Sequence, residues 1–235
     1  MVEMTAKPHT HTTTLLALAA LAVIAAGCAK TAVRKDVALV ADTVQTAAAA
    51  ASTDTVSGTF TDSRDGKTYR TVKIGDQTWM AENLNYKTGK SVCYDKEKSN
   101  CQKYGRLYDW KTAMKACPAG WHLPSDKEWT ALTDFVGGED TAGTKLKSKT
   151  GWSTNNGYKA ATDDYGFSAL PGGYRWSGSF FSAGYRGYWW SATEYGASNA
   201  WGRGMRNYYD YVTRYDDYKT FLFSLRCVRD FAAPQ

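Results

Sequence analysis

Histidine is scarce in this sequence, and its scarcity argues against several classes of enzyme. The 235 residues include only three histidines, His9, His11 and His122, and the first two precede an apolar run near the N-terminus. A zinc site with two histidine ligands needs a pair of them, and a catalytic triad would depend on His122 alone. We therefore expect no catalytic metal site and none of the common hydrolytic activities.

The sequence also lacks any block of like charges. It has 29 Lys and Arg against 23 Asp and Glu, a formal net charge of +6, and residues of both signs are interspersed. Residues 58–235 carry the whole excess of positive charge, because Lys and Arg equal Asp and Glu in number in the residues before them. A nucleic-acid interface needs a concentrated basic stripe. We therefore expect no nucleic-acid partner.

No apolar run is long enough to cross a bilayer. Residues 15–26 are apolar and uncharged, which is too short for a membrane-spanning helix but typical of the h-region of a signal peptide. The run leads into Ala25-Ala26-Gly27-Cys28, which resembles the bacterial lipobox except that Ala25 stands where that motif usually has Leu. We expect residues 1–27 to be a lipoprotein signal peptide and Cys28 to carry the lipid. An ordinary secretory signal with an unrelated cysteine is the alternative.

The residues after Cys28 predict a tether. Residues 28–57 are rich in Ala, Thr and Val and contain no aromatic residue, so they cannot supply a core. A short helical stripe of valines is the alternative to a flexible spacer. Ala29 after the cysteine favours sorting to the outer membrane. We therefore expect a domain at residues 58–235 in the cell envelope, attached to the outer membrane by its lipid and exposed at the surface.

The domain has four cysteines and no CxxC spacing. They are Cys93, Cys101, Cys117 and Cys227. An even number in an exported protein indicates disulfides, and four cysteines allow three pairings. Cys93 and Cys101 flank a short polar loop and are expected to pair, which leaves Cys117 to pair with Cys227. A redox or metal-binding pair is the less favoured alternative.

Residues 58–138 predict strands followed by two helices. Residues 58–86 read as two or three strands with an Asp65-Gly66 hairpin turn. A 3-4-3 spacing predicts an amphipathic helix through Leu107, Trp110, Met114 and Cys117. Ser125 and Glu128 have the spacing of a capping box, so Glu128 is interpreted as a cap and not as a catalytic carboxylate. The second helix is expected to bury Trp129, Leu132 and Phe135 and to end at Gly137-Gly138.

Seven short motifs occur in order along the domain. They are DGKTY at 65–69, QTWMAENL at 77–84, YGRLY at 104–108, CPAGWHLP at 117–124, GFSALPGG at 166–173, WWSATE at 189–194 and SLRCVRD at 224–230. Together they closely resemble the Fibrobacter succinogenes major paralogous domain family, which is common in bacterial surface lipoproteins. The resemblance covers residues 58–230. It implies an α+β, C-type-lectin-like fold, akin to the formylglycine-generating-enzyme branch, with two helices, small twisted antiparallel sheets and long loops.

The function of that fold does not follow from the fold itself. Calcium-dependent lectins of this fold carry Glu-Pro-Asn or Gln-Pro-Asp together with Trp-Asn-Asp, and none of these tripeptides occurs here. We therefore expect no cofactor. Asp163-Asp164 and Asp216-Asp217 are candidate ligands of a structural calcium ion, with solvated loop acids as the favoured alternative. The oxidase branch uses reactive cysteines, whereas all four here are expected in disulfides, so we expect no enzyme.

Residues 195–218 have the composition of a binding surface. They contain six Tyr, three Gly, three Asp, three Arg and two Asn, a mixture that resembles an antibody paratope. Alternation from Trp201 to Arg206 predicts a strand with one anchored and one free face, whereas Trp189 and Trp190 are expected to pack inside. The expected ligand-binding residues are Tyr195, Ser198, Asn199, Gly202, Gly204, Arg206, Tyr208, Tyr209, Asp210, Tyr211, Thr213, Tyr215, Asp216, Asp217 and Tyr218.

The resemblance also suggests how such a surface arises. Relatives of the family often have runs of Asn in this region. Some lectin-fold lipoproteins are variable proteins of diversity-generating retroelements, in which Asn codons change to those of Tyr, Asp, Ser, Gly or Arg. We therefore expect a lipid-anchored display domain that binds an extracellular protein or glycan through a hypervariable face. A carbohydrate-binding adhesin and a structural envelope lipoprotein without a defined ligand are the alternatives.

Overall fold

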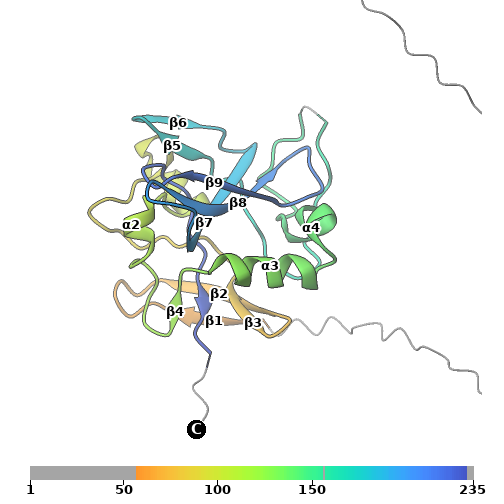
Figure 1. Ribbon diagram of the computed structural model, residues 1–235, viewed down its shortest axis with the longest axis horizontal. Helices are drawn as coiled ribbons and strands as arrows, with labels where there is room; N and C mark the ends of the chain where they lie inside the picture. Colours follow the sequence, from red (N-terminus) through yellow and green to blue (C-terminus); the bar gives the residue numbers. More distant parts are fainter. Residues whose placement is uncertain (1–56, 156, 232–235) are drawn as a thin grey trace, which may run out of the picture. The chain divides into compact units, whose positions relative to one another are not determined.

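The computed structural model describes residues 57–155 and 157–231. The described residues form an α+β domain of small antiparallel sheets and four α-helices (Figure 1). None of these helices is long and apolar enough to cross a membrane. The expected signal peptide, the lipidation at Cys28 and the tether lie outside the described residues. The C-type-lectin-like character of the fold stays a prediction.

The first sheet joins the beginning of the domain to its end. It comprises β1 (Ser57–Thr61), β2 (Thr68–Ile74), β3 (Gln77–Met80), β10 (Val228–Arg229) and β4 (Trp121–His122), in the order β1-β2-β3-β10-β4. Gly66 and Gly75 have φ of 71° and 58°, which glycine adopts without a steric penalty. The strands and hairpin turns predicted for residues 58–86 are thus confirmed.

Two further sheets build the other half of the domain. β5 (Tyr174–Trp176) pairs with β6 (Ser179–Phe181), and β8 (Asn199–Arg206) lies between β7 (Arg186–Glu194) and β9 (Thr213–Tyr218). Figure 1 shows α3 (Asp126–Phe135) lying between the first sheet and the sheet β7-β8-β9. The helix therefore has to bury apolar side chains toward both.

The capping box of α3 is confirmed. The Ser125 hydroxyl accepts from the backbone N–H of Glu128 at 3.2 Å, and a Glu128 carboxylate oxygen accepts from the backbone N–H of Ser125 at 2.7 Å. Trp129 and Leu132 are buried as expected. Phe135 is not: it is 51% exposed, because it lies in the last turn, where its ring covers Gly75 of the β2–β3 turn from outside.

The remaining helices differ from the prediction. The structure has α1 (Lys98–Tyr104), α2 (Trp110–Ala113) and α4 (Glu139–Leu146), and a 3-10 turn at Tyr94–Lys96. The prediction of a long helix from Leu107 to Cys117 is wrong. Leu107 pairs with Val92 in a β-bridge, and the short α2 already ends at its C-cap Met114. α1 and α4 were not expected, since neither segment has a clear apolar stripe.

Three tryptophans join the layers. Trp79 of β3, Trp129 of α3 and Trp189 of β7 are fully buried, with ring centroids 4.8 Å apart for the first pair and 6.5 Å for the second. Trp190 is also fully buried, so the expectation that Trp189 and Trp190 pack inside is confirmed. These rings are among the largest fully buried side chains of the described residues, and each buries about 150 to 250 Å².

Arg226 lies in this core without a carboxylate partner. Its guanidinium donates to the Asn83 amide oxygen at 3.0 Å and to the backbone carbonyls of Phe167 and Ser168. Burial lowers the pKa of Arg226 to about 9. The same Asn83 oxygen accepts from the Trp189 indole at 2.8 Å. Four of the family motifs therefore meet at one buried polar cluster.

Both predicted disulfides are present. Cys93 pairs with Cys101, with Cα atoms 4.9 Å apart, and Cys117 pairs with Cys227, with Cα atoms 6.0 Å apart. The second bond closes a sequence separation of 110 residues and ties β10 to the segment before β4. It therefore fastens β10 to the segment that leads into its neighbour β4, the edge strand of the first sheet.

Removal of the two disulfides should have unequal effects. The variant Cys117→Ala/Cys227→Ala should lose about 4 to 5 kcal/mol of unfolding free energy, against about 2 to 3 for Cys93→Ala/Cys101→Ala, because the longer loop gains more entropy when opened. Urea unfolding at neutral pH measures both. An equal loss in the two variants would contradict this account.

Candidate functional site

The strand β8 carries its glycines on a covered face. Gly202 lies opposite Trp190 and Tyr215, and a Cβ on it would come within 2.9 Å of the Tyr215 hydroxyl. Gly204 is enclosed by Tyr215 and Tyr188 in the same way. The expectation of a free face is therefore wrong here, because tyrosine rings occupy the space that the glycines leave.

Tyr215 serves this packing. Its hydroxyl donates to the backbone carbonyl of Arg203 at 3.1 Å, and burial raises the pKa of Tyr215 well above its ordinary value. Its ring stands edge-on to Tyr188, with centroids 5.3 Å apart. Of Gly202, Gly204 and Tyr215, all expected at the ligand surface, Gly202 thus serves sheet packing, whereas Gly204 and Tyr215 both pack within the sheet and line a surface pocket.

The other face of β8 is fastened to α3. Arg203 is fully buried and donates to an Asp126 carboxylate oxygen at 2.6 Å, and Arg214 of β9 donates to the same carboxylate at 3.0 Å. Burial alone would raise the pKa of Asp126. The hydrogen bonds from Arg214 and Arg203 outweigh this effect, so the pKa of Asp126 lies below its ordinary value. The Arg214 guanidinium also lies 3.4 Å from the centre of the Trp201 ring. These contacts fix β8 and β9 as a rigid platform.

The loop that follows β8, residues 207–212, is held from inside by Lys147. This lysine is fully buried at the end of α4, and burial lowers its pKa to about 8. Its amine donates to the backbone carbonyls of Tyr209 at 2.9 Å and of Arg206 and Lys159 at 3.3 Å. Three donors thus meet three acceptors, and the loop backbone is tied to the helix.

Helix α4 makes further main-chain contacts with this loop. The backbone N–H of Thr144 donates to the carbonyl of Asp210 at 3.0 Å, and that of Val212 donates to the carbonyl of Glu139 at 3.0 Å. A Cβ on Gly143 would lie 2.5 Å from the Tyr211 carbonyl oxygen, so only glycine allows this approach. These backbone contacts, together with the buried Asn207 amide that donates to the carbonyls of Ser153 and Asn155, set the path of the loop.

The tyrosine side chains of the loop pack on one another. The rings of Tyr209 and Tyr211 are stacked with centroids 4.3 Å apart, and Tyr208 meets Tyr209 edge-on at 4.4 Å. Arg206 donates to the Tyr208 hydroxyl at 3.1 Å and lies over the Tyr209 ring. Tyr211 is exposed, and Tyr208 and Tyr209 are half-buried. We call these three residues the tyrosine cluster.

The other expected ligand residues lie along the β8–β9 edge. Tyr195 and Ser198 are exposed in the turn between β7 and β8, and Tyr218 is exposed at the end of β9. Asn199, Thr213, Asp216 and Asp210 are half-buried. Asn199 donates to Asp216 at 2.8 Å, and Asp210 accepts from the Thr144 hydroxyl at 3.0 Å.

Beside this edge lies a surface hollow that the sequence did not predict. It consists of two small pockets of about 220 Å³ each, which share Tyr188 and Asp217 as walls. We call it the aromatic hollow. Its lining residues are Tyr174, Tyr188, Gly204, Arg206, Thr213, Tyr215, Asp216, Asp217, Phe221 and Phe223.

Strand register explains why aromatic rings gather there. Arg175 of β5 pairs with Leu222 in an antiparallel bridge. Side chains alternate between the faces of a strand, so Tyr174 and Trp176 share the opposite face with Phe221 and Phe223. The alternation of aromatic residues in Tyr174-Arg175-Trp176 and Phe221-Leu222-Phe223 was the signal that could have revealed the hollow.

Asp217 is the acidic group of the hollow. Burial raises its pKa to about 6, with the neighbouring Asp216 charge acting in the same direction. A backbone hydrogen bond from Tyr218 acts in the opposite direction, and no side chain of the described residues forms a hydrogen bond or ion pair with the Asp217 carboxylate. An acid of raised pKa in a concave site is typical of functional positions.

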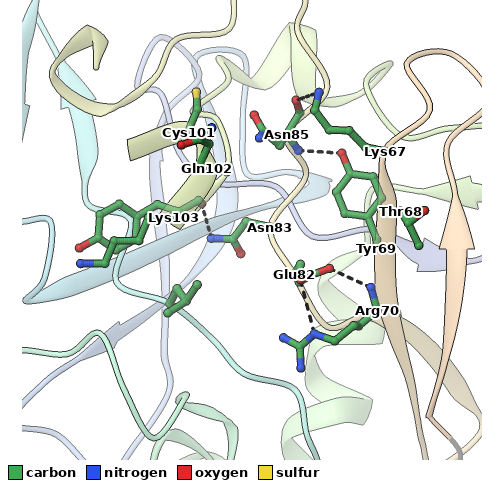
Figure 2. A pocket seen from close by; sticks show the side chains of 13 residues that line it. Lys67, Thr68, Tyr69, Arg70, Glu82, Asn83, Asn85, Cys101, Gln102 and Lys103 are labelled. Atoms are coloured by element: carbon green, nitrogen blue, oxygen red, sulfur yellow. Dashed lines mark hydrogen bonds and ion pairs between the residues drawn. The ribbon is translucent and has the colours of Figure 1, made fainter. Parts of the chain in front are cut away.

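A separate polar pocket lies between β2 and the end of α1. It measures about 250 Å³ and is lined by charged side chains. Figure 2 shows Arg70 facing Glu82, and Lys67 donating to the Asn85 carbonyl at 2.8 Å. Because Arg70, Glu82 and Lys67 are bonded within the chain and Lys103 lies over the Tyr104 ring, we regard this pocket as structural.

The calcium candidates are dispersed. Asp163 accepts from the backbone N–H and the hydroxyl of Ser168, at 2.8 and 2.7 Å, and Asp216 accepts from Asn199. The described part of the chain has no group of three or more His, Cys, Asp or Glu placed to hold a metal ion. His122 lies between Asp230 and Glu128, with each ring nitrogen bonded to one of the two carboxylates.

Replacement of Lys147 should loosen the tyrosine cluster. Lys147→Met should lower the unfolding free energy by about 3 kcal/mol, because three buried carbonyls lose their donor. Urea unfolding measures the loss. Lys149→Met, at an exposed position two residues on, is the control and should change little. Equal stability of the two variants would contradict the role of Lys147.

Replacement of Asp217 should stabilise the domain at neutral pH. Above pH 6 the Asp217 carboxylate is ionised in the folded protein, and its unfavourable burial lowers the free energy of unfolding. Below about pH 3.8 the carboxyl is protonated in both the folded and the unfolded chain, so this loss of stability disappears. Asp217→Asn should therefore gain about 1 kcal/mol at pH 7.5, discounted for partial exposure, and gain nothing at pH 3.5. Urea unfolding at both pH values measures this, and a loss at pH 7.5 would refute it.

Comparison with known proteins identifies the family. The model of the Fibrobacter succinogenes major domain matches residues 72–229. No curated protein and no solved structure matches the chain. The match begins within β2 and includes β3, β4 and β10 of the first sheet, the disulfide from Cys117 to Cys227 and the sheet β7-β8-β9. The chain therefore belongs to the Fibrobacter succinogenes major domain family.

Proposed function

We propose that this protein is a display domain that binds an extracellular ligand. The ligand surface consists of the tyrosine cluster at one end of the β8–β9 hairpin and of the exposed residues Tyr195, Ser198 and Tyr218 at the other end. Binding through an aromatic, mostly rigid surface costs little conformational entropy. The ligand is a protein or a glycan from outside the cell.

The observation that carries this proposal is how the loop at residues 207–212 is held. Its path is set by main-chain hydrogen bonds to α4 and to the Lys147 amine, and these bonds do not depend on which side chains the loop presents. The side chains of Tyr208, Tyr209 and Tyr211 are then free to serve another purpose. A backbone fixed by a scaffold with replaceable side chains is the arrangement used by binding loops.

The same observation supports two related proposals. A loop whose backbone path does not depend on the side chains at positions 208, 209 and 211 tolerates diversification at those positions, as expected for a variable protein of a diversity-generating retroelement. The tether at residues 28–57, with its lipid on Cys28, would hold the domain at the outer membrane and present it to the surroundings. We propose binding without catalysis, since Cys93, Cys101, Cys117 and Cys227 are all in disulfides and His122 lies between two carboxylates.

A capture experiment tests the binding surface. The purified full chain is immobilised and exposed separately to a protein fraction and to a glycan fraction from the surroundings of the producing cells. The variant Tyr208→Ala/Tyr209→Ala/Tyr211→Ala should capture at least 10-fold less ligand than wild type, because the aromatic contacts are lost. Quantitative mass spectrometry or sugar analysis measures the bound material.

The control is Phe231→Ala, which removes an aromatic ring that is 70% exposed beyond β10. It should capture as much ligand as wild type. Equal capture by wild type and the triple variant would overturn the assignment of the site. No capture from either fraction would favour a structural envelope protein without a defined ligand.

A further inference from the structure

We infer that the aromatic hollow is a saccharide subsite, in which a sugar ring stacks on aromatic side chains while its hydroxyls bond to Asp217. The inference rests on the proposed ligand-binding function and names the ligand class. It also adds residues outside 195–218, chiefly Tyr174, Trp176, Tyr188 and Phe221. The hollow lies next to the exposed end of β9, so one glycan could contact both surfaces.

The rim of the hollow offers parallel, exposed rings. Trp176 is stacked on Phe221 at 5.5 Å with planes 11° apart, and Tyr218 is stacked on Phe221 at 6.5 Å with planes 17° apart. Trp176 is 49% exposed and Tyr218 57% exposed. The flat face of a pyranose bears C–H bonds of partial positive charge, and the face of an aromatic ring is negative. Such rings therefore attract sugars.

The interior of the hollow supplies both hydrogen-bond donors and hydrogen-bond acceptors. Asp217 provides two acceptor oxygens, the Thr213 hydroxyl both donates and accepts, and the Arg206 guanidinium donates. Hydroxyl groups of a sugar also donate and accept, so they can satisfy this mixed set. Since Asp217 is partly desolvated and has no side-chain partner among the described residues, a hydrogen bond to it is stronger than one made in water.

Size and charge separate a sugar from other ligands. Each pocket is smaller than the roughly 300 to 1,000 Å³ of sites for drug-sized molecules, which suits single rings. A lipid tail would leave Asp217 buried without a partner, at a cost. A methylated ammonium group would suit the rings and the carboxylate, but the Arg206 cation on the same wall would repel it.

Binding of the full chain to a printed array of bacterial, plant and animal glycans tests the inference. At least one glycan should bind, and its affinity is then measured by titration in solution. Asp217→Asn and Trp176→Ala should each weaken that affinity at least 10-fold. Asp164→Asn, which removes one charge from an exposed loop, is the matched control and should leave it unchanged. Urea unfolding confirms that each variant is folded.

Three results would overturn the inference: no glycan bound on the array, wild-type affinity in Asp217→Asn, or binding of tetramethylammonium in place of every glycan. None of these results decides the capture experiment with the tyrosine-cluster variant. Ligand capture that depends on Tyr208, Tyr209 and Tyr211 but not on Asp217 would keep the proposed function and reject the saccharide subsite. Failure of the proposed function would instead appear as capture that the triple variant leaves unchanged.

Discussion

The hydrogen bonds between Asn83 and its buried partners hold the domain together. The Asn83 amide oxygen accepts from Arg226 and from the Trp189 indole, and its amide nitrogen donates to the Tyr104 carbonyl and to the Ser224 hydroxyl. An unpaired buried guanidinium is costly, so each partner requires the others. The segment after β3, the end of α1, the strand β7 and the segment before β10 are thereby forced to meet at one point.

That fixed centre allows the surface around β8 and β9 to be irregular. Arg203 and Arg214 share the Asp126 carboxylate. Beneath the loop at residues 207–212, the Lys147 amine holds backbone carbonyls by hydrogen bonds. Charged groups with few alternative partners define geometry more narrowly than apolar contacts, which tolerate sliding. The surface can therefore carry exposed tyrosines without loss of its backbone path.

The sequence predicted features governed by local chemistry. The hairpin turn at Gly66, the capping box at Ser125 and both disulfides follow from residue type and spacing. The short α2 did not, because pairing of Leu107 with Val92 outweighs an apolar spacing that fits a helix. Within the candidate site, exposure of Tyr195, Tyr211 and Tyr218 agrees with the prediction. The burial of Gly202 and Gly204 depends on cross-strand neighbours such as Tyr215, which no local pattern reveals.

The place of β10 in the first sheet has a consequence for the order of folding. Val228 and Arg229 pair with strands formed by residues about 100 to 150 positions earlier in the chain. The first sheet therefore stays incomplete until residues 228 and 229 have found their partners. Its completion depends on pairing between segments that are far apart in the sequence, which is intrinsically slow.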